Sequence, residues 1–372
     1  MIATPTSTTL PIGLSGELCP PLVRTVAAHG LAASALDEWP VAPLGADEWV
    51  DFVALVDEHR LWSMLADAIA SGSMPTTASQ ADLVRRHDTE AVLTCLHLDR
   101  ALVALHRRVA ARGIEIRFFK GVTTVLGFYA EPGLRNYSDI DLLVRDTDLD
   151  RLIEVLVGEG AERMGTSRWS GVRLADGWEI DLHQSLRHGP FGAAIPAGEL
   201  FEPHATLAIA DAVVPTLTLP ALFVAACFNV ILPNDLRKLS PLRDVAEMLA
   251  SGRLDDAEVL ALAERWRCSV VVGAAVRTAA ELFALDPTSP LVPWARAFVP
   301  SPRERRWLAT YHDTSPRHVF KQVWHTTTAY RSRRDGARFV WRQVFHEGRD
   351  PLAVRVRHLR QRLDLPGSST TG

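Results

Sequence analysis

Two aspartates, Asp139 and Asp141, stand one residue apart within an apolar run of the sequence. Ile140 lies between them and Leu142 to Val144 follow, a composition that favours a β-strand. Residues i and i+2 of a strand project from the same face, so both carboxylates would point the same way. Like charges side by side repel each other, whereas a hard cation such as Mg²⁺ takes oxygen ligands and pairs with phosphate. The pair therefore indicates a metal site, although the same motif also occurs at solvated strand ends and helix caps.

A third carboxylate follows on a later strand. The pattern predicts two strands, at residues 171–174 and 178–183, and the Asp-Gly pair between them is typical of a hairpin. Alternation on the second strand places Asp181 and His183 on one face and apolar residues on the other. A carboxylate in the middle of a strand is costly unless it is paired or coordinated. Three aspartates on two strands that could be neighbours are thus candidates for one site.

A Lys-Gly turn precedes the acidic strand. Residues 114–119 predict a strand that leads into Lys120 and Gly121, and residues 122–129 predict a helix. A strand, a glycine turn and a helix N-terminus form an anion site, because free backbone N–H groups point outward there. Gly121 would let a phosphate approach the backbone closely, and Lys120 would add a positive charge. A plain turn is the alternative, since the sequence has no Walker A motif here.

The bulk composition is that of an ordinary globular protein. The 372 residues are 47% hydrophobic and 23% charged, and the net charge of -4 gives no general attraction to nucleic acid or a membrane. Four widely spaced cysteines argue against a zinc site or a disulfide framework and fit a reducing cytoplasm. The first residues do not resemble a signal peptide, and the longest apolar run, residues 221–232, is too short to span a bilayer. We therefore expect a cytoplasmic protein without a membrane partner.

Helical patterns flank the predicted strands on both sides. Helices are predicted in these segments: a short one near 21–29, then 46–71, 78–112, 148–157, 219–232, 243–251, 256–267 and 270–284. Charged residues between the helices at 219–232 and 243–251, Arg243 and Asp244 among them, either close over a ligand or form salt bridges at helix ends, and we favour the salt bridges. The region from Arg317 to Arg362 is rich in arginine and aromatic residues. It could hold RNA, or form amphipathic helices with snorkelling arginines, which we favour.

Taken together, these residues resemble the nucleotidyltransferase superfamily typified by DNA polymerase β, and more narrowly the bacterial "uncharacterised nucleotidyltransferase" family. The narrower pattern is a Lys-Gly turn, an Arg just before Asp-Ile-Asp-Leu-Leu-Val, and a later Asp-Leu-His. Here these are Lys120-Gly121, Arg135, residues 139–144 and residues 181–183. The broader superfamily usually has Gly-Gly or Gly-Ser at the turn, whereas Val122 follows the glycine here.

The resemblance implies an α+β fold, a polymerase β-like core with a small mixed sheet flanked by N- and C-terminal helical regions. We expect a loop-rich segment at 1–45, a helical region at 46–112, the core at 113–215, a helical domain at 216–300 and a basic helical tail at 301–372 with a disordered end.

The resemblance also implies an activity, the Mg²⁺-dependent transfer of a nucleoside monophosphate from an NTP to a hydroxyl or phosphate of a small molecule or peptide. Asp139, Asp141 and Asp181 would hold two Mg²⁺ ions, with Mn²⁺ as an alternative, and Asp181 would help to remove the proton of the attacking hydroxyl. The phosphates would be bound by Lys120, Gly121, Arg135 and Ser138, while His183 would order Asp181 or hydrogen-bond to the sheet.

Two other hypotheses stay open. One is transfer of a different group on the same scaffold, for instance from a sugar nucleotide or a phosphorylated peptide. The other is a non-catalytic module that binds a nucleotide or RNA. Nucleic acid as a partner is compatible with the basic tail but is not favoured.

Overall fold

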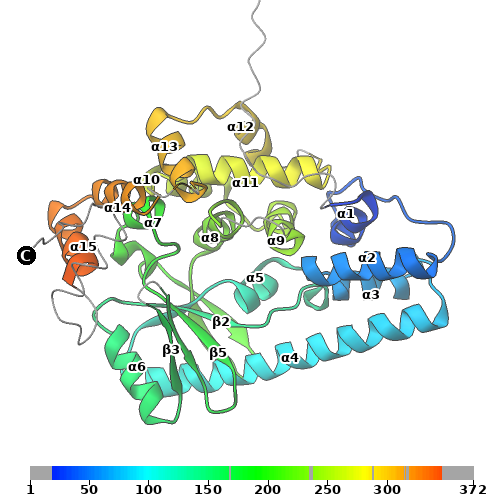
Figure 1. The fold of residues 1–372 in the computed structure, drawn as a ribbon, viewed down its shortest axis with the longest axis horizontal. Coiled ribbons are helices and arrows are strands. Elements are labelled where there is room, and N and C mark those ends of the chain that lie inside the picture. Colours follow the sequence, from blue (N-terminus) through cyan, green and yellow to red (C-terminus); the bar gives the residue numbers. More distant parts are fainter. Residues whose placement is uncertain are drawn as a thin grey trace, which may run out of the picture.

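A seven-stranded mixed sheet and a large set of helices make up the protein, which confirms the α+β class (Figure 1). The structure, a computed structural model, describes residues 19–166, 169–233, 238–286, 289–313, 315 and 318–345. The sheet has the strand order β3-β4-β5-β2-β1-β7-β6. Its strands are β1 (Ile116–Phe118), β2 (Ile140–Val144), β3 (Glu162–Thr166), β4 (Trp169–Arg173), β5 (Glu179–His183), β6 (Ala205–Ile209) and β7 (Ala212–Thr216).

The centre of the sheet carries the predicted acidic strands. β2 pairs in parallel with β5 and antiparallel with β1, and β1 pairs in parallel with β7. β4 and β5 form the predicted hairpin, where the backbone N–H of Leu174 donates to the Trp178 carbonyl at 2.8 Å. Gly177 has a φ of 90° in this turn, a conformation that glycine adopts without a steric penalty. Strands β3, β6 and β7 were not predicted from the sequence.

The first helices follow the predicted pattern with one difference. They are α1 (Pro21–Ala28), α2 (Ala46–His59), α3 (Trp62–Ala70) and α4 (Ala78–Ala110). The continuous helical pattern at 46–71 is broken into α2 and α3, because Arg60 adopts a left-handed conformation with a φ of 58°. α4 begins at a capping box, in which the Gln80 N–H donates to Thr77 and the Gln80 side chain accepts from the Thr77 N–H.

The remaining helices follow the first strand of the sheet. They are α5 (Gly121–Phe128), η1 (Pro132–Leu134), α6 (Leu149–Gly158), α7 (Pro190–Ala194), η2 (Ala197–Leu200), α8 (Leu219–Ile231), α9 (Leu239–Ala250), α10 (Asp256–Arg265), α11 (Ser269–Leu282), α12 (Leu291–Ala297), α13 (Pro302–Tyr311), α14 (His318–Ala329) and α15 (Arg333–Phe345). α14 and α15 confirm helices in the part of the basic tail that the structure describes, and the predicted disordered end lies outside it. Within the described residues, no helix has both the length and the apolar character that a membrane span requires.

Two hydrophobic clusters organise these elements. One cluster joins buried residues of α1–α3 to those of α8–α13, so the N-terminal and C-terminal helices share a core. The other lies between the sheet, α4 and α6. α5 lies between the sheet and helices α8 and α9, while α4 runs from the sheet to α2 and α3 (Figure 1). The strands that carry the aspartates lie where these layers meet. The domain boundaries expected from the sequence stay a prediction.

Candidate active site

The acidic strands β2 and β5 are neighbours in register. Asp141 pairs with Asp181 across the parallel ladder, so their side chains leave the same face of the sheet. Ile140 and Ile180, the residues before them, are buried in the core on the opposite face. The structure thus brings together two of the three aspartates that the sequence placed on neighbouring strands, and Asp139 precedes β2 by one residue.

Three side chains could hold a metal ion. Asp141, Asp181 and His183 each offer one ligand atom, and these atoms all lie within 4.8 Å of one another. Two carboxylates and an imidazole suit a divalent cation such as Mg²⁺ or Mn²⁺, with carboxylates preferred by the harder ion. These three side chains therefore fit the Mg²⁺ or Mn²⁺ expected from the sequence. His183 was not predicted as a metal ligand.

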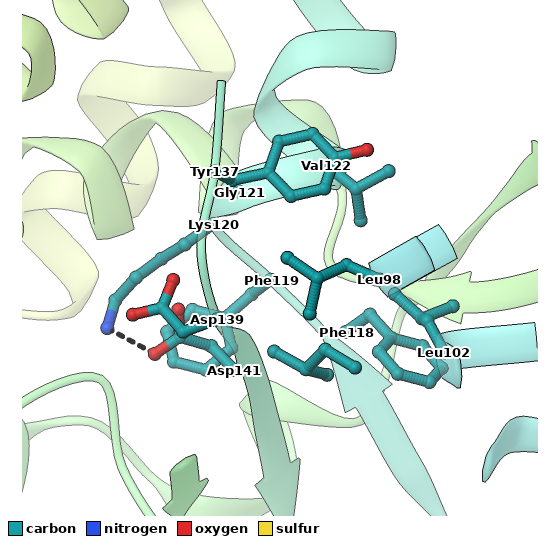
Figure 2. A pocket seen from close by; sticks show the side chains of 11 residues that line it. Leu98, Leu102, Phe118, Phe119, Lys120, Gly121, Val122, Tyr137, Asp139 and Asp141 are labelled. Atoms are coloured by element: carbon teal, nitrogen blue, oxygen red, sulfur yellow. Dashed lines mark hydrogen bonds and ion pairs between the residues drawn. The ribbon is translucent and has the colours of Figure 1, made fainter. Parts of the chain in front are cut away.

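Asp139 lies at the exposed mouth of this cluster, beside the carboxylate of Asp141 (Figure 2). Partial burial of the carboxylate, which keeps water away from it, raises the pKa of Asp139. The negative charges of Asp141 and Asp181 raise this pKa further. The positive charges of Lys120 and Arg60 act in the opposite direction. Asp139 is thus coupled electrostatically to both other aspartates, as a shared cation site would require.

Lys120 supplies a positive charge to the same cluster. Its Nζ lies 2.7 Å from Oδ1 of Asp141. A dashed line marks this ion pair in Figure 2. The Lys120 backbone has a φ of 61° and a ψ of -166°, a conformation that residues with a side chain rarely adopt. Gly121 follows with a φ of 40° and begins α5, so the predicted turn between strand and helix is present. The unusual backbone aims the lysine at the carboxylates.

Asp141 is the buried member of the cluster and is held in its charged form. Burial alone would raise its pKa, but the charge of Lys120 and the hydrogen bond and charge of His183 outweigh burial and lower the pKa. Nε2 of His183 lies 2.8 Å from Oδ1 of Asp141, and the His183 ring packs edge-on against Phe119 with centroids 5.1 Å apart. His183 therefore contacts Asp141, and its predicted effect on Asp181 stays a prediction.

Arg135 lies close to the cluster but is bound to a helix of the C-terminal region. Its Nε and a terminal nitrogen donate to the two carboxylate oxygens of Asp244 on α9, at 2.8 and 3.0 Å. The Tyr129 hydroxyl donates to the same carboxylate at 2.8 Å. Asp244 and Arg243 both form buried ion pairs, the latter with Glu247, which confirms the salt-bridge prediction for these two residues. The phosphate contact expected of Arg135 stays a prediction.

The next two residues of this loop are bound to two other helices. The amide of Asn136 donates to Ser63 on α3, and the Tyr137 hydroxyl donates to Asp99 on α4 at 2.6 Å. The Tyr137 N–H also donates to the sulfur of Cys95 on α4 at 3.3 Å. These contacts fix the backbone that leads directly into Asp139.

Ser138, the last residue before Asp139, is contacted from α2. A terminal nitrogen of Arg60 lies 3.4 Å from the Ser138 hydroxyl oxygen. Arg60, which follows α2, and Asp99 on α4 were not predicted as part of the site, because they are far away in the sequence and nothing local distinguishes them from surface charges. Their partners are 78 and 38 residues away, respectively.

A pocket opens between the turn, the acidic strand and α4 (Figure 2). Its apolar wall stands opposite the charged side chains of Lys120, Asp139 and Asp141. It is lined by Leu98, Leu102, Phe118, Phe119, Lys120, Gly121, Val122, Tyr137, Asp139, Ile140 and Asp141. Asp139 and Asp141 therefore border a small hollow that has one polar and one apolar side.

The structure has a mixed sheet with carboxylates in register on adjacent strands, next to a glycine turn, as the resemblance to nucleotidyltransferases implied. Comparison with known proteins gives the family: the model of the uncharacterised nucleotidyltransferase family matches residues 45–284, and this chain belongs to that family. The match extends beyond the sheet and includes α2–α4 and α8–α11. None of the curated proteins matches the chain.

Solved structures with some similarity include two nucleotidyltransferase-like proteins. One is the antibiotic-resistance factor ANT(2'')-Ia, at 17% identity and a TM-score of 0.32, covering 46% of this chain and 96% of that one. The other is an antigenic nucleotidyltransferase-like protein from Paracoccidioides brasiliensis, at 15% identity and a TM-score of 0.31, covering 48% of this chain and 91% of that one. At these values neither structure says what this chain acts on.

Proposed function

We propose that this protein is a metal-dependent nucleotidyltransferase, which moves a nucleoside monophosphate from an NTP to a hydroxyl or phosphate of a small molecule or peptide. The observation that supports this most is the register of Asp141 with Asp181, which aims two carboxylates and the imidazole of His183 at one point. Nothing in the stability of a sheet requires this grouping, because like charges in neighbouring positions repel. Membership of the nucleotidyltransferase family supports the same proposal.

Each residue of the proposed site has a separate role. Asp139, Asp141 and Asp181 would hold Mg²⁺, which when bound neutralises negative charge on the phosphates and on the leaving group. His183 would keep Asp141 oriented through the hydrogen bond already present. Lys120 is paired with Asp141 in this structure and would turn toward the phosphates when a cation takes its place. Gly121 would let a phosphate approach the start of α5 closely.

The proposed reaction is a single displacement at the α-phosphorus of the NTP. The acceptor oxygen forms a bond to that phosphorus, the bond to the β-phosphate oxygen breaks, and pyrophosphate leaves with the electron pair. Where the acceptor is a hydroxyl, its proton passes to the carboxylate of Asp181, which borders the site at intermediate exposure, and then to solvent. Ser138 would contribute a hydroxyl contact to a phosphate at the exposed mouth.

The sequence implied that Arg135 binds the phosphates, whereas we propose that its main role is to hold a loop in place. Its guanidinium donates to Asp244 through two hydrogen bonds, so we propose that it fixes the loop before Asp139 and acts on phosphates only through its charge.

A direct test uses the full chain with each of the four NTPs labelled at the α-phosphate, Mg²⁺, and fractions of small molecules or peptides as acceptors. We expect label transfer to an acceptor and stoichiometric release of pyrophosphate for at least one NTP. Asp181→Asn should abolish both, whereas Asp150→Asn, the same change at an exposed carboxylate on α6, should leave both unchanged. Absence of transfer with all four NTPs, or equal transfer by Asp181→Asn, would contradict the proposal.

A second candidate function is RNA binding by the C-terminal helices. It is supported by the exposed aromatic side chains of Phe320, Trp324 and Trp341 on α14 and α15, which are 52%, 60% and 64% exposed. Arginines on α15 would hold phosphates while the aromatic rings stack on bases. In the full chain, salt-sensitive RNA binding that is lost in Trp324→Ala would favour this candidate over the first.

A further inference from the structure

Arg60 occupies a backbone position where glycine is the usual residue. It follows α2 with a φ of 58° and a ψ of 53°. The Arg60 N–H donates to the Asp57 carbonyl at 3.0 Å, and the Leu61 N–H donates to the Val56 carbonyl at 2.9 Å. This pair of bonds is a helix ending that most often uses glycine, because a side chain in the left-handed region costs roughly 1–2 kcal/mol. The fold alone would therefore favour glycine at this position.

The side chain of Arg60 extends from this position to the mouth of the acidic cluster. A terminal nitrogen lies 3.4 Å from the hydroxyl of Ser138, and the positive charge of Arg60 acts on Asp139. The residue is exposed, so its guanidinium remains accessible to a ligand. In the part of the chain that the structure describes, no carboxylate lies within ion-pair distance of it: the salt bridges found there involve other cations.

A triphosphate that approaches three aspartates is repelled unless positive charges meet it. Lys120 and Arg60 are two of the cations that act on Asp139, one from the turn before α5 and the other from the end of α2. A guanidinium binds phosphate through two parallel N–H donors, which suits a flexible, highly charged ligand. Arg60 is placed to do this, because its guanidinium reaches Ser138 and its charge acts on Asp139.

We propose that Arg60 binds the triphosphate of the donor nucleotide, so that the helical region before the sheet contributes directly to the active site. This inference rests on the proposed function, because it requires an NTP as the donor. It adds a binding residue that the motif around the aspartates does not contain. It also assigns a ligand-binding role to the break between α2 and α3.

The backbone conformation provides an unusual test, because Arg60→Gly removes the guanidinium and relieves the strain at once. If Arg60 had only a structural role, Arg60→Gly would bind the nucleotide as the wild type does. In either case the variant should be at least as stable as the wild type. Arg267 provides the matched control, since it follows α10 with a φ of 56°. Its N–H donates to Glu264 at 3.0 Å and the next N–H, from Cys268, donates to Ala263 at 2.8 Å. Arg267 is exposed and its charge acts on Arg303 of α13, away from the aspartates.

The experiment measures binding of each of the four NTPs with Mg²⁺, and of inorganic tripolyphosphate with Mg²⁺, by isothermal titration calorimetry of the full chain. We expect Arg60→Gly to bind both the NTP and tripolyphosphate at least fivefold more weakly than the wild type. Arg267→Gly should bind both as the wild type does. Thermal unfolding of the two glycine variants should show no loss of stability in either.

The possible outcomes separate this inference from the proposed function. If the wild type binds no NTP, the proposed function and the role of Arg60 fail together. If the wild type binds an NTP and Arg60→Gly binds it within fivefold, the proposed function stands and the inference is overturned. A loss that appears for the NTP but not for tripolyphosphate would also overturn it, because the contact would then lie on the nucleoside.

Discussion

Removing the carboxylate of Asp244 should destabilise the protein strongly. Arg135 donates two hydrogen bonds to it, at 2.8 and 3.0 Å, and Tyr129 donates a third at 2.8 Å. The side chains of Arg135 and Asp244 are only 11% and 10% exposed, so solvent screens this pair little. Loss of one partner of a buried ion pair leaves an uncompensated charge and costs about 3–5 kcal/mol. We expect Asp244→Ala to lower the free energy of unfolding by this amount.

The measurement is equilibrium urea unfolding of the full chain, followed by circular dichroism. The matched control is Asp211→Ala, because Asp211 accepts from Arg107 at the same 2.8 Å but the two side chains are 74% and 58% exposed. Surface pairs of this kind contribute little to stability, because solvent screens the two charges. If Asp244→Ala costs as little as Asp211→Ala, the argument from burial is wrong.

A double variant separates the two roles considered for Arg135. Replacing both partners of a buried pair by apolar residues of similar size is often close to neutral. We therefore expect Arg135→Met combined with Asp244→Leu to recover most of the stability lost in Asp244→Ala. If this folded variant still binds Mg²⁺-NTP as the wild type does, Arg135 only fixes the loop, whereas a loss of at least tenfold would show that Arg135 acts on the phosphates.

Three further predictions concern the acidic cluster and the turn. Asp141→Asn and Asp181→Asn should each lower label transfer by more than about 100-fold, because substitution of residues that only support metal ligands already costs about 10- to 100-fold in activity. Mg²⁺ should also no longer raise the unfolding temperature of these two variants. The pKa of Asp141 is lower in the folded chain than in the unfolded chain, where it is about 4. The stability that the Asp141 carboxylate contributes is therefore fully present at pH values above the unfolded-state pKa, and it is lost as the pH falls through the folded-state pKa. The difference in unfolding free energy between the wild type and Asp141→Asn should therefore shrink as the pH is lowered from about 6 to about 3, and a difference that grows would refute the assignment. Gly121→Ala and Gly113→Ala should each lower the free energy of unfolding in urea by roughly 1–2 kcal/mol, because both glycines have a positive φ, at which the Cβ of alanine is strained.

The parts of the fold that follow from local patterns were predicted correctly. The alternation around Asp139 and Asp181 is a two-residue period, and the Asp-Gly turn is a local signal, so both strands and their shared face could be inferred. Strand β6 was missed because two of its five residues are alanine, which is depleted in strands, and β7 was missed because it contains Pro215. Their pairing depends on a hairpin through Ala210, which has a φ of 51° without being a glycine.

What could not be predicted depends on contacts between distant residues. The pair of Arg135 with Asp244 spans 109 positions, and the contact of Arg60 with Ser138 spans 78. Each of these charged residues has a sequence environment that fits a solvated helix end equally well. Only the packing of α1–α3 against α8–α13 in one hydrophobic cluster brings them to the sheet.

The loop before Asp139 shows why the helices belong to the site. Arg135 is bound to α9, Asn136 to α3, Tyr137 to α4, and Ser138 is contacted from the end of α2. Four consecutive residues are thus each held by a different helix, and the next residue is a candidate metal ligand. A carboxylate must be positioned within about 0.5 Å to act with its partners. The strand alone fixes Asp141, whereas the position of Asp139 depends on the helices on both sides of the sheet, which is consistent with a family match that extends over all of them.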